Sequence, residues 1–505
     1  MNTLKSLYNH SLALLTDFYQ LTMAYSLWKS AKAGYEGTFD LYFRANPFHG
    51  GYTIACGLQT AIDYIKNFHF SGEDVDYLAT LKGNDDAPLF STSFLDYLRN
   101  LRLTCNIDAV PEGTVVFPNQ PLVRVSGPII QCQLLETPML NIINFQTLIA
   151  SKASRICQVT SGEPVLEFGL RRAHGIDGAT TASRAAYIGG VDATSNVLAG
   201  KLYDIPVRGT HAHSWIMTFD NELEAFDEYA KAMPNNCVLL VDTYDTIKGV
   251  HNAVEIGKKL REKGFDLAGI RLDSGDLAYL SIQARRILDE GGFPNTAIVA
   301  SNDLDENIIL SLKDQDAQIT VWGVGTKLAT AWDQPALGGV YKLTALRAPG
   351  GEWQYKIKLS EQREKVSNPG IHQIRRFQYK NEFIADAIYD ERISDMANPI
   401  IVDPMDHTRQ KLIHANATFE DLLKPVFRNG DYVYDAPDIH TSRRFAQEQL
   451  TGFHTGIKRF VNPHQYPVGL ERKLHQLKTE LIFEARRQNV GGNQPGAPES
   501  QQSKY

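Results

Sequence analysis

Three short segments of the sequence carry residue types that together can bind a phosphorylated sugar. Residues 209–215 read Gly-Thr-His-Ala-His-Ser-Trp, residues 271–276 read Arg-Leu-Asp-Ser-Gly-Asp, and residues 323–326 read Gly-Val-Gly-Thr. A neutral imidazole can accept a phosphoryl group or a proton. A carboxylate can accept hydrogen bonds from a ribose diol, and glycine-rich backbone amides can surround a phosphate group. The three segments therefore predict an enzyme that handles a phosphorylated sugar.

Each of these polar residues also has a purely structural interpretation. His211 and His213 would share a face in a strand and diverge in a tight loop, and either can be a hydrogen-bonded histidine of the core. No convincing further metal ligand lies near them in the sequence. Asp273 either binds a ligand or stabilises the end of a strand. Asp276 opens a helix, either beside a phosphate or as a simple N-cap.

Two further segments can contribute to a phosphate site. Residues 189–196 (Gly-Gly-Val-Asp-Ala-Thr-Ser-Asn) form a second glycine loop that leads into a helix, with Thr194 or Ser195 as its cap. Arg171 and Arg172 follow an apolar run and can hold phosphate or carboxylate as bidentate donors. The alternative is that they are ordinary surface arginines. Lys327 directly follows the Gly-Val-Gly-Thr segment, which by itself is also compatible with an ordinary turn.

The elements that must position these residues alternate between short apolar strands and helices. The predicted strands are 165–168, 238–241, 267–272, 297–300 and 319–322, and the predicted helices between them include 246–263 and 277–288. Uninterrupted apolar strands alternating with helices indicate a parallel sheet covered on both faces. A β/α barrel and a doubly wound sheet both fit this spacing. We favour the barrel, because polar residues follow many different strands and the G-x-G-x-x-G fingerprint is absent.

The rest of the chain divides into regions of different pattern. We expect an N-terminal α+β domain at residues 1–155, the barrel with the active site at 156–350, and a C-terminal segment at 351–490 that packs on both. Residues 491–505, rich in Gly, Gln, Ser and Pro, predict a disordered tail. Within these regions the patterns predict helices at 12–28, 57–68, 134–157 and 470–487, a strand at 38–43, and short strands and turns over 108–128.

The composition is that of an ordinary globular protein. The chain has 505 residues, of which 43% are hydrophobic and 22% charged, and its net charge of −7 does not favour nucleic acid or an anionic membrane as a partner. No apolar run is long enough to span a membrane, and we expect a cytoplasmic protein. The five cysteines form no C-x-x-C pair, so we expect neither a disulfide framework nor a structural zinc site.

Taken together in this order, the motifs resemble those of the nicotinate phosphoribosyltransferase family. The resemblance extends from residue 16 to about residue 482 and closely follows the bacterial branch that lacks a zinc-binding cysteine cluster. The segments that carry it are 16–23 (Thr-Asp-Phe-Tyr-Gln-Leu-Thr-Met), 168–173, 189–200, 209–215, 241–245 (Val-Asp-Thr-Tyr-Asp), 271–277, 301–303 (Ser-Asn-Asp), 321–327 and 462–468 (Asn-Pro-His-Gln-Tyr-Pro-Val).

This resemblance implies the first step of nicotinate salvage to NAD. Nicotinate and phosphoribosyl pyrophosphate would give nicotinate mononucleotide and pyrophosphate, with ATP hydrolysed in the coupled reaction and Mg²⁺ required. It also implies the type II phosphoribosyltransferase fold, an irregular β/α barrel with an α+β domain built from both chain ends. Family members are usually homodimers with active sites shared between subunits.

The resemblance also implies roles for single residues. His213 matches the histidine that ATP phosphorylates, whereas His211 occupies a variable position and receives no role. Asp273 matches the ribose-binding carboxylate. Arg171 matches a contact to phosphate or pyrophosphate.

Seven further residues are expected to bind substrate. Tyr19 and Thr210 match contacts to nicotinate, and Arg271 matches a contact to its carboxylate. Ser195 and Asn196 belong to the glycine loop of residues 189–200, and Gly325 and Thr326 match the loop that binds the 5′-phosphate.

Other functions are compatible with parts of the pattern. Nicotinamide phosphoribosyltransferase would have no electrostatic use for Arg271, because its substrate is neutral. Quinolinate phosphoribosyltransferase would need more basic residues and is usually a much shorter chain. A flavin-binding or sugar-phosphate-binding barrel with redox or aldol chemistry is an alternative from another class. A noncatalytic relative is disfavoured because His213, Thr210 and Asp273 are all present.

Overall fold

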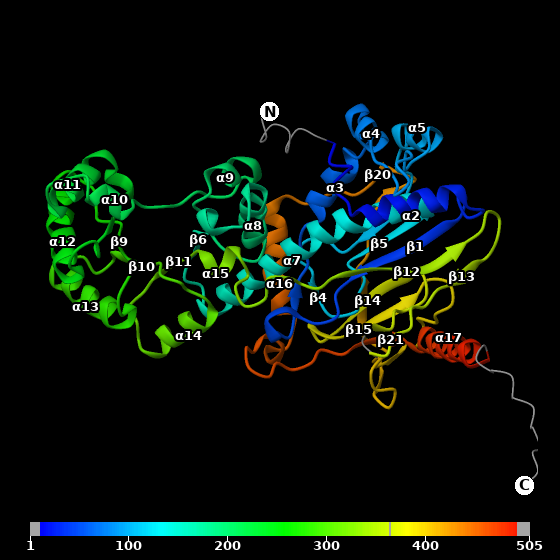
Figure 1. Ribbon diagram of the computed structural model, residues 1–505. Helices are drawn as coiled ribbons and strands as arrows, with labels where there is room; N and C mark the ends of the chain where they lie inside the picture. The colour runs from blue at the N-terminus through cyan, green and yellow to red at the C-terminus, as the bar shows by residue number, and fades with distance from the viewer. Residues whose placement is uncertain (1–10, 363–364, 492–505) are drawn as a thin grey trace, which may run out of the picture.

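The computed structural model describes residues 11–362 and 365–491 and contains three large sheets. One is parallel and two are mainly antiparallel. In Figure 1 the parallel sheet and its helices lie on the left, and the antiparallel sheets lie on the right. Residues 492–505, which include all but one residue of the predicted disordered tail, lie outside the described residues.

The parallel sheet has six strands, and the helices that follow them form its outer layer (Figure 1). In spatial order the strands are β7 (Ala193–Thr194), β6 (Val165–Glu167), β11 (Val321–Val324), β10 (Ala297–Ala300), β9 (Gly269–Leu272) and β8 (Val238–Leu240). The outer helices are α8 (Ile176–Ile188), α9 (Val197–Tyr203), α10 (His213–Ile216), α11 (Glu222–Ala232), α12 (Thr246–Glu262), α13 (Leu277–Glu290), α14 (Glu306–Asp314) and α15 (Thr326–Ala329).

Residues 205–211 bridge the two edges of this sheet and give it the form of an irregular barrel. Val207 pairs in parallel with Thr194 beside β7, and the Leu240 N–H at the end of β8 donates to His211 Nε2 at 3.3 Å. The chain between these two contacts crosses from one edge strand to the other in Figure 1. The expected barrel is therefore confirmed, with an irregular segment in place of a regular strand on one side.

Aspartate and asparagine side chains start most of the outer helices. Asn196, Asn221, Asp245, Asp276 and Asp305 each accept a backbone N–H of the first turn of α9, α11, α12, α13 and α14. These residues are the preferred N-caps because their oxygens satisfy donors that the helix cannot. In a parallel β/α unit the helix N-termini lie at the carboxyl edge of the sheet, so this edge carries exposed N–H groups and positive helix dipole ends.

A seven-stranded sheet unites segments from the whole length of the chain. Its order is β13 (Trp353–Tyr355), β12 (Val340–Arg347), β1 (Glu36–Tyr42), β5 (Val123–Pro128), β3 (Asn106–Ala109), β19 (Lys424–Arg428) and β20 (Asp431–Tyr432). Because β1 pairs with β12 and β3 pairs with β19, the N-terminal domain includes later parts of the chain. The prediction of a domain built from both chain ends is confirmed. We expected the barrel to extend to residue 350. Residues 340–347 instead pair with β1 and belong to this sheet.

The second antiparallel assembly belongs to the C-terminal part of the chain. Its order is β17 (Gln410–Leu412), β16 (Ile400–Val402), β21 (Val468–Glu471), β15 (Glu382–Asp390), β14 (His372–Tyr379) and β18 (Thr418–Asp421). A two-stranded ladder joins β2 (Thr53–Ile54) to β4 (Val115–Val116). Arg376 and Asp386, both fully buried, form an ion pair in this sheet, and Arg376 also donates to the Val115 carbonyl at 2.7 Å. This contact fastens the C-terminal sheet to the N-terminal domain.

Helices of the N- and C-terminal regions cover these sheets. They are α2 (Phe18–Lys29), α3 (Leu58–Lys66), α4 (Gly72–Ala79), α5 (Thr92–Asn100), α6 (Ile129–Leu134), α7 (Glu136–Val159), α16 (Ile439–Thr451) and α17 (Arg472–Gly491), with the short 3₁₀ turns η1 (Pro47–His49) and η5 (Thr455–Lys458). Two further 3₁₀ turns, η2 (Leu170–Arg172) and η3 (Pro234–Asn236), lie in the barrel. The predicted buried helix at 134–157 is α7, and its last two turns are almost entirely buried. The predicted helix at 12–28 begins only at Phe18.

Two local predictions about the glycine loops are wrong. Gly323 and Val324 are the end of strand β11, so only Gly325 and Thr326 belong to the loop and the start of α15. Asn196, and neither Thr194 nor Ser195, caps α9 through its side chain. Thr194 lies in β7, and its hydroxyl is buried. In the described part of the chain, no helix is both long and apolar enough to cross a membrane.

Candidate active site

The carboxyl edge of the parallel sheet brings together the polar residues that follow β8, β9 and β10. Arg271, at the end of β9, is the centre of this cluster and its side chain is only 14% exposed. Its guanidinium donates to Thr210 Oγ1 at 3.0 Å, to Ser301 Oγ at 2.6 Å and to Asp273 Oδ1 at 2.8 Å. A planar guanidinium offers five N–H donors, so Arg271 fixes three neighbours and keeps donors for a ligand.

Asp273 keeps one carboxylate oxygen free of these contacts. Its Oδ1 accepts from both Arg271 and Ser301, the latter at 2.6 Å, whereas Oδ2 lies 3.7 Å from Nε2 of His213. The side chain is 23% exposed and caps no helix. The cap of α13 is Asp276, whose Oδ1 accepts from the Tyr279 N–H at 3.0 Å. Asp276 is thus the N-cap of α13, whereas Asp273 caps no helix.

The two histidines have opposite surroundings. His213 begins α10 with a side chain that is 41% exposed, and its Nδ1 lies 3.1 Å from Thr243 Oγ1. His211 is buried against Tyr229, and its Nε2 accepts the Leu240 N–H. Burial lowers the pKa of His211 to about 4. His211 is therefore a neutral core histidine at pH 7, whereas His213 is the one that faces solvent and Asp273.

Four residues of this cluster had no predicted role, although each lies within three residues of the end of an apolar strand. Asp242, after β8, accepts the Asp273 N–H at 2.8 Å and the Ser274 hydroxyl at 2.7 Å through Oδ2, and its buried Oδ1 has no hydrogen-bond partner. Thr243 contacts His213, and Ser301 contacts Asp273. Phe168, after β6, lies with its ring centroid 5.7 Å from Cζ of Arg271. The shared signal was the position of a polar or aromatic residue at a strand end.

Gly323 is required by the close approach of Phe168. A Cβ at Gly323 would lie 2.7 Å from the Phe168 ring, and a Cβ at Gly325 would lie 3.2 Å from the Phe168 carbonyl oxygen. The glycines therefore allow β11 and its loop to pack directly on the residue after β6. Lys327 is directed away from the loop, since its Nζ pairs with Asp305 at 2.7 Å.

Four further residues singled out in the sequence lie on turn η2 and on the connection from β7 to α9. Arg171 and Arg172 lie on the exposed turn η2, and neither has a carboxylate within 4 Å among the residues that the structure describes. Ser195 is half-buried between β7 and α9. Asn196 is buried, its Oδ1 caps α9, and its Nδ2 contacts the Ala179 carbonyl and the Ser183 hydroxyl. Both polar atoms of the Asn196 side chain are therefore already hydrogen-bonded within the protein.

Tyr19 does not join the barrel cluster within one chain. It lies on α2 in the N-terminal domain, its side chain is exposed, and α2 is on the far side of α7 from the barrel in Figure 1. It lines a hollow of about 360 Å³ together with Asn141 and Phe145 of α7. These two residues also line a larger neighbouring pocket.

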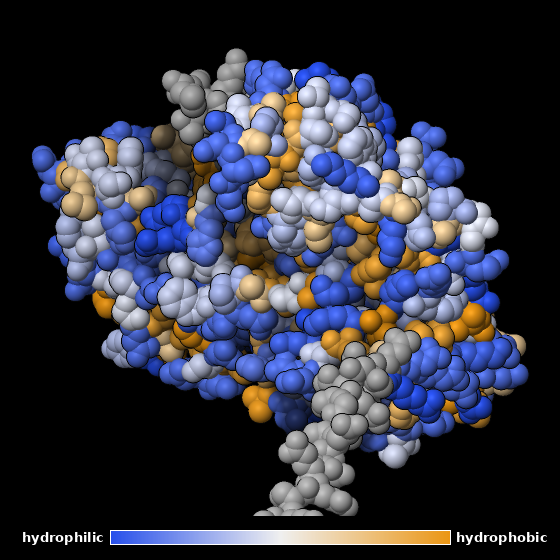
Figure 2. Space-filling model, turned by 45° about the vertical axis from the view of Figure 1, so that its right-hand side comes forward, coloured by the Kyte–Doolittle hydropathy of each residue, from blue (hydrophilic) through white to orange (hydrophobic). Residues whose placement is uncertain are grey.

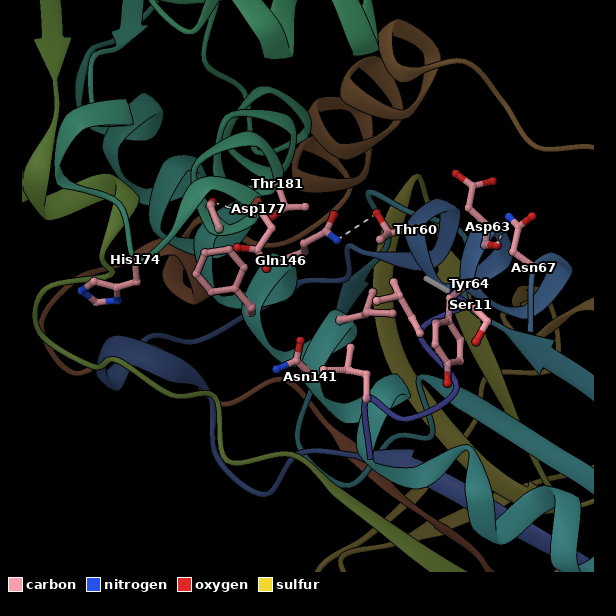
Figure 3. Close-up of a pocket in the computed structure, with 15 residues that line it drawn as sticks. Ser11, Thr60, Asp63, Tyr64, Asn67, Asn141, Gln146, His174, Asp177 and Thr181 are labelled. Atoms are coloured by element: carbon pink, nitrogen blue, oxygen red, sulfur yellow. Dashed lines mark hydrogen bonds between the residues drawn. The ribbon is translucent and has the colours of Figure 1, made fainter. Parts of the chain in front are cut away.

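The larger pocket, of about 580 Å³, lies between the N-terminal domain and the start of α8 (Figure 3). Asn141 and Gln146 come from α7, Thr60 and Tyr64 from α3, and Asp177 from α8. Gln146 donates to Thr60 Oγ1 at 3.0 Å, which is the dashed line between these two labelled residues in the close-up. None of the barrel-edge residues described above lines this pocket.

The fold and this cluster define a class: a β/α barrel whose polar residues converge at the carboxyl edge of the sheet, where enzymes of this architecture place their active sites. Family models for nicotinate phosphoribosyltransferase match residues 14–144 (N-terminal domain), 164–365 (the family itself) and 372–478 (C-terminal domain). The chain belongs to the nicotinate phosphoribosyltransferase family.

Individual relatives agree with this assignment over nearly the whole length. The chain is 43% identical to nicotinate phosphoribosyltransferase of Bacillus subtilis, covering 94% of this chain and 96% of the relative. It is 37% identical to that of Caenorhabditis elegans, covering 92% of each. The crystal structure of human nicotinic acid phosphoribosyltransferase matches with a TM-score of 0.79 at 30% identity, covering 93% of this chain and all of that one. A nicotinate-nucleotide pyrophosphorylase from Pyrococcus furiosus shares the fold, with a TM-score of 0.67 at 20% identity over 88% of this chain and 96% of that one.

Proposed function

We propose that this protein transfers the phosphoribosyl group of phosphoribosyl pyrophosphate to nicotinate, and that ATP hydrolysis is coupled to the transfer through phosphorylation of His213. The observation that carries the proposal is the convergence of Arg271, Asp273, Thr210 and His213 at one edge of the barrel. Membership in the nicotinate phosphoribosyltransferase family supports the choice of substrates.

The transfer forms a bond between the pyridine nitrogen and the anomeric carbon while the bond from that carbon to the pyrophosphate oxygen breaks. Positive charge develops on the ribose and negative charge on the leaving group. Asp273 Oδ2 is free to accept from the ribose hydroxyls, and Arg171 is available to neutralise the pyrophosphate. Arg271 retains donors for the nicotinate carboxylate, which favours nicotinate over the neutral nicotinamide.

Phosphorylation of His213 is supported by its exposure and by its hydrogen bond. When Nδ1 donates its proton to Thr243 Oγ1, the lone pair of the imidazole lies on Nε2, the nitrogen that faces Asp273. Nε2 would form a bond to the γ-phosphorus of ATP as the bond from that phosphorus to the ADP oxygen breaks and ADP leaves. The phosphoryl group would add negative charge beside the pyrophosphate site until water hydrolyses it to phosphate. Buried His211 has no such access, because its Nε2 already accepts a backbone N–H.

The carboxylates at this edge also fit the Mg²⁺ that the family implies. Mg²⁺ binds proteins through one or two carboxylates together with phosphate oxygens and water. Asp242, with its buried unpartnered Oδ1, and the partly exposed Asp273 supply such a pair. The ion would neutralise phosphate charge on the substrates.

A homodimer with shared sites accounts for the position of Tyr19. Large apolar side chains are exposed on α9, where Val197 is 70% and Leu202 58% exposed, and on α2, where Phe18 is 55% exposed. Figure 2 shows such apolar patches within a mostly hydrophilic surface. Exposed apolar patches mark association surfaces. We propose that α2 of one subunit brings Tyr19 to the barrel edge of the other.

One assay tests the substrates directly. Nicotinate and nicotinamide are offered side by side with phosphoribosyl pyrophosphate, with and without ATP, and mononucleotide formation is measured. The proposal expects turnover of nicotinate that ATP stimulates, and little turnover of nicotinamide. Equal use of both pyridines would contradict the assigned role of Arg271.

A labelling experiment tests the phosphohistidine. With γ-labelled ATP, wild-type protein should acquire an acid-labile label, His213→Asn should acquire none, and His211→Asn, where it folds, should retain it. Label mapped to His211, or label that persists in the His213 variant, would refute the assignment.

A further inference from the structure

Glu167 is a buried carboxylate at the end of β6 that the proposed chemistry does not use. It is 1% exposed. Its Oε1 accepts the Gly169 N–H, and its Oε2 accepts the Ser183 hydroxyl at 2.8 Å and the Thr194 hydroxyl at 2.6 Å. Within the described ranges, no lysine, arginine or histidine nitrogen lies within 4 Å of it. Burial of a carboxylate without a cation is unfavourable unless hydrogen bonds compensate it, so these three donors are what holds it there.

Through Oε1, Glu167 holds the turn that carries Arg171. Gly169 directly precedes η2, and its N–H is fixed by the Glu167 carboxylate. A Cβ at Gly169 would lie 2.3 Å from Cβ of Ala329 and 3.0 Å from the Gly325 carbonyl oxygen. The turn is therefore pressed against the loop before α15, and a shift of Gly169 would move both Arg171 and that loop.

Through Oε2 and its own backbone, Glu167 holds the turn between β7 and α9. The Thr194 hydroxyl that donates to Oε2 also accepts the Asn196 N–H at 3.0 Å. The Ser195 N–H donates to the Glu167 carbonyl at 2.9 Å. Ser183, the third donor, also contacts Asn196 Nδ2 at 3.3 Å. One carboxylate thus links strands β6 and β7 and helix α8 at the point where Ser195 leaves the sheet.

We infer that Glu167 is a positioning residue for the phosphoribosyl pyrophosphate site, which holds Arg171, Ser195 and the Gly325–Thr326 loop in one arrangement. The inference rests on the proposed location of that substrate. The two carboxylate oxygens of Glu167 share the three donors, whereas an amide in its place would offer a single acceptor oxygen. The hydrogen bonds of Glu167 hold residues that are proposed to bind phosphate. None of them involves Thr210 or Arg271, which are proposed to bind nicotinate.

The first test is Glu167→Gln. We expect KM for phosphoribosyl pyrophosphate and the calorimetric Kd for pyrophosphate to rise about tenfold, as for loss of one charge-assisted hydrogen bond. KM for nicotinate should change less than about twofold. Glu163→Gln is the matched control, because Glu163 lies just before the same strand and accepts from Trp322 Nε1 and Lys313 Nζ at 2.7 and 2.8 Å. It should lower the melting temperature without the rise in KM.

A second pair of variants covers the case in which Glu167→Gln does not fold. Thr194→Val keeps the size of the side chain and removes the donor to Glu167, whereas Thr194→Ser keeps the donor and removes a methyl group. The valine variant should show the raised KM and Kd, and the serine variant should resemble wild type. Equal KM values for the valine and serine variants would overturn the positioning role. So would a rise in KM that is proportional to the loss in melting temperature across all the variants, the Glu163→Gln control included. A wild-type protein that neither transfers phosphoribosyl groups nor binds pyrophosphate would refute the proposed function itself.

Discussion

At the scale of single residues, Asp273 is the residue whose proposed role in binding ribose is tested most directly. Its carboxylate is positioned by Arg271 and Ser301 and keeps Oδ2 free beside His213. A ribose diol that donates to this oxygen would make a charge-assisted hydrogen bond.

We predict that Asp273→Asn lowers kcat/KM by roughly ten- to a hundredfold with little change in stability. The loss corresponds to about 1.5–3 kcal/mol for one hydrogen bond to a charged group, at 1.36 kcal/mol per tenfold. Steady-state kinetics and thermal melting on the same preparation measure it.

Asp276→Asn is the matched control, since asparagine caps helices as well as aspartate. It should alter neither quantity, because Asp276 only caps α13. Near-normal kcat/KM together with a lowered melting temperature in Asp273→Asn would instead make Asp273 a structural residue.

At the scale of elements, helix α8 is joined to the N-terminal domain by a buried ion pair. Arg184 of α8 donates to Glu112 at 2.7 and 2.6 Å, and both side chains are about 6–7% exposed. Burial alone would raise the pKa of Glu112, but the charge and hydrogen bonds of Arg184, with the Gly57 N–H, outweigh it and lower the pKa. The barrel is thus fixed electrostatically to the domain beside it.

We predict that Glu112→Gln lowers the free energy of unfolding at pH 7 by about 3–5 kcal/mol, as expected when one partner of a buried pair is removed. Because the folded pKa of Glu112 is lowered, its contribution is complete above the ordinary pKa near 4.5 and is lost as pH falls through the folded value. The difference between wild type and variant, measured by urea unfolding, should therefore shrink below about pH 4.5. A difference that stays constant down to pH 3 would contradict the ion-pair explanation.

At the scale of the whole molecule, the position of Tyr19 on α2 predicts that one chain alone is incomplete. The proposed dimer would place Tyr19 of one subunit beside Asp273 of the other. Each variant Tyr19→Ala and Asp273→Ala should be inactive as a homodimer.

Refolded mixtures of the two chains should regain up to about half of the wild-type activity per mixed dimer, because one of the two sites then holds both residues intact. Sedimentation shows the dimer, and tagged chains allow the mixed species to be isolated. Isolated mixed dimers without activity, beside active refolded wild-type dimers, would exclude shared sites.

Much of the barrel was predictable because its determinants are local. A buried parallel strand must be apolar along its whole length, and the following helix must start with a capping residue. The strand at 297–300 and the start of the helix at 246 were therefore predicted at their observed bounds, and β8 and β9 within a few residues. The prediction of a loop over residues 323–326 was wrong at Gly323, because glycine is typical of turns in sequence. In the structure Gly323 lies in β11, and a glycine is needed there because the Phe168 ring packs against it.

The sequence by itself determined the order of strands and helices along the barrel and the residue types available at each strand end. Only the tertiary structure decided which of those residues meet. Arg271 contacts Thr210, 61 positions away, and Glu112 pairs with Arg184, 72 positions away. It also decided that His213 is exposed and His211 buried, although they are two residues apart. The physical reason is that strand and helix formation depend on neighbouring residues, whereas burial, ion pairing and hydrogen bonding depend on residues that folding brings close in space.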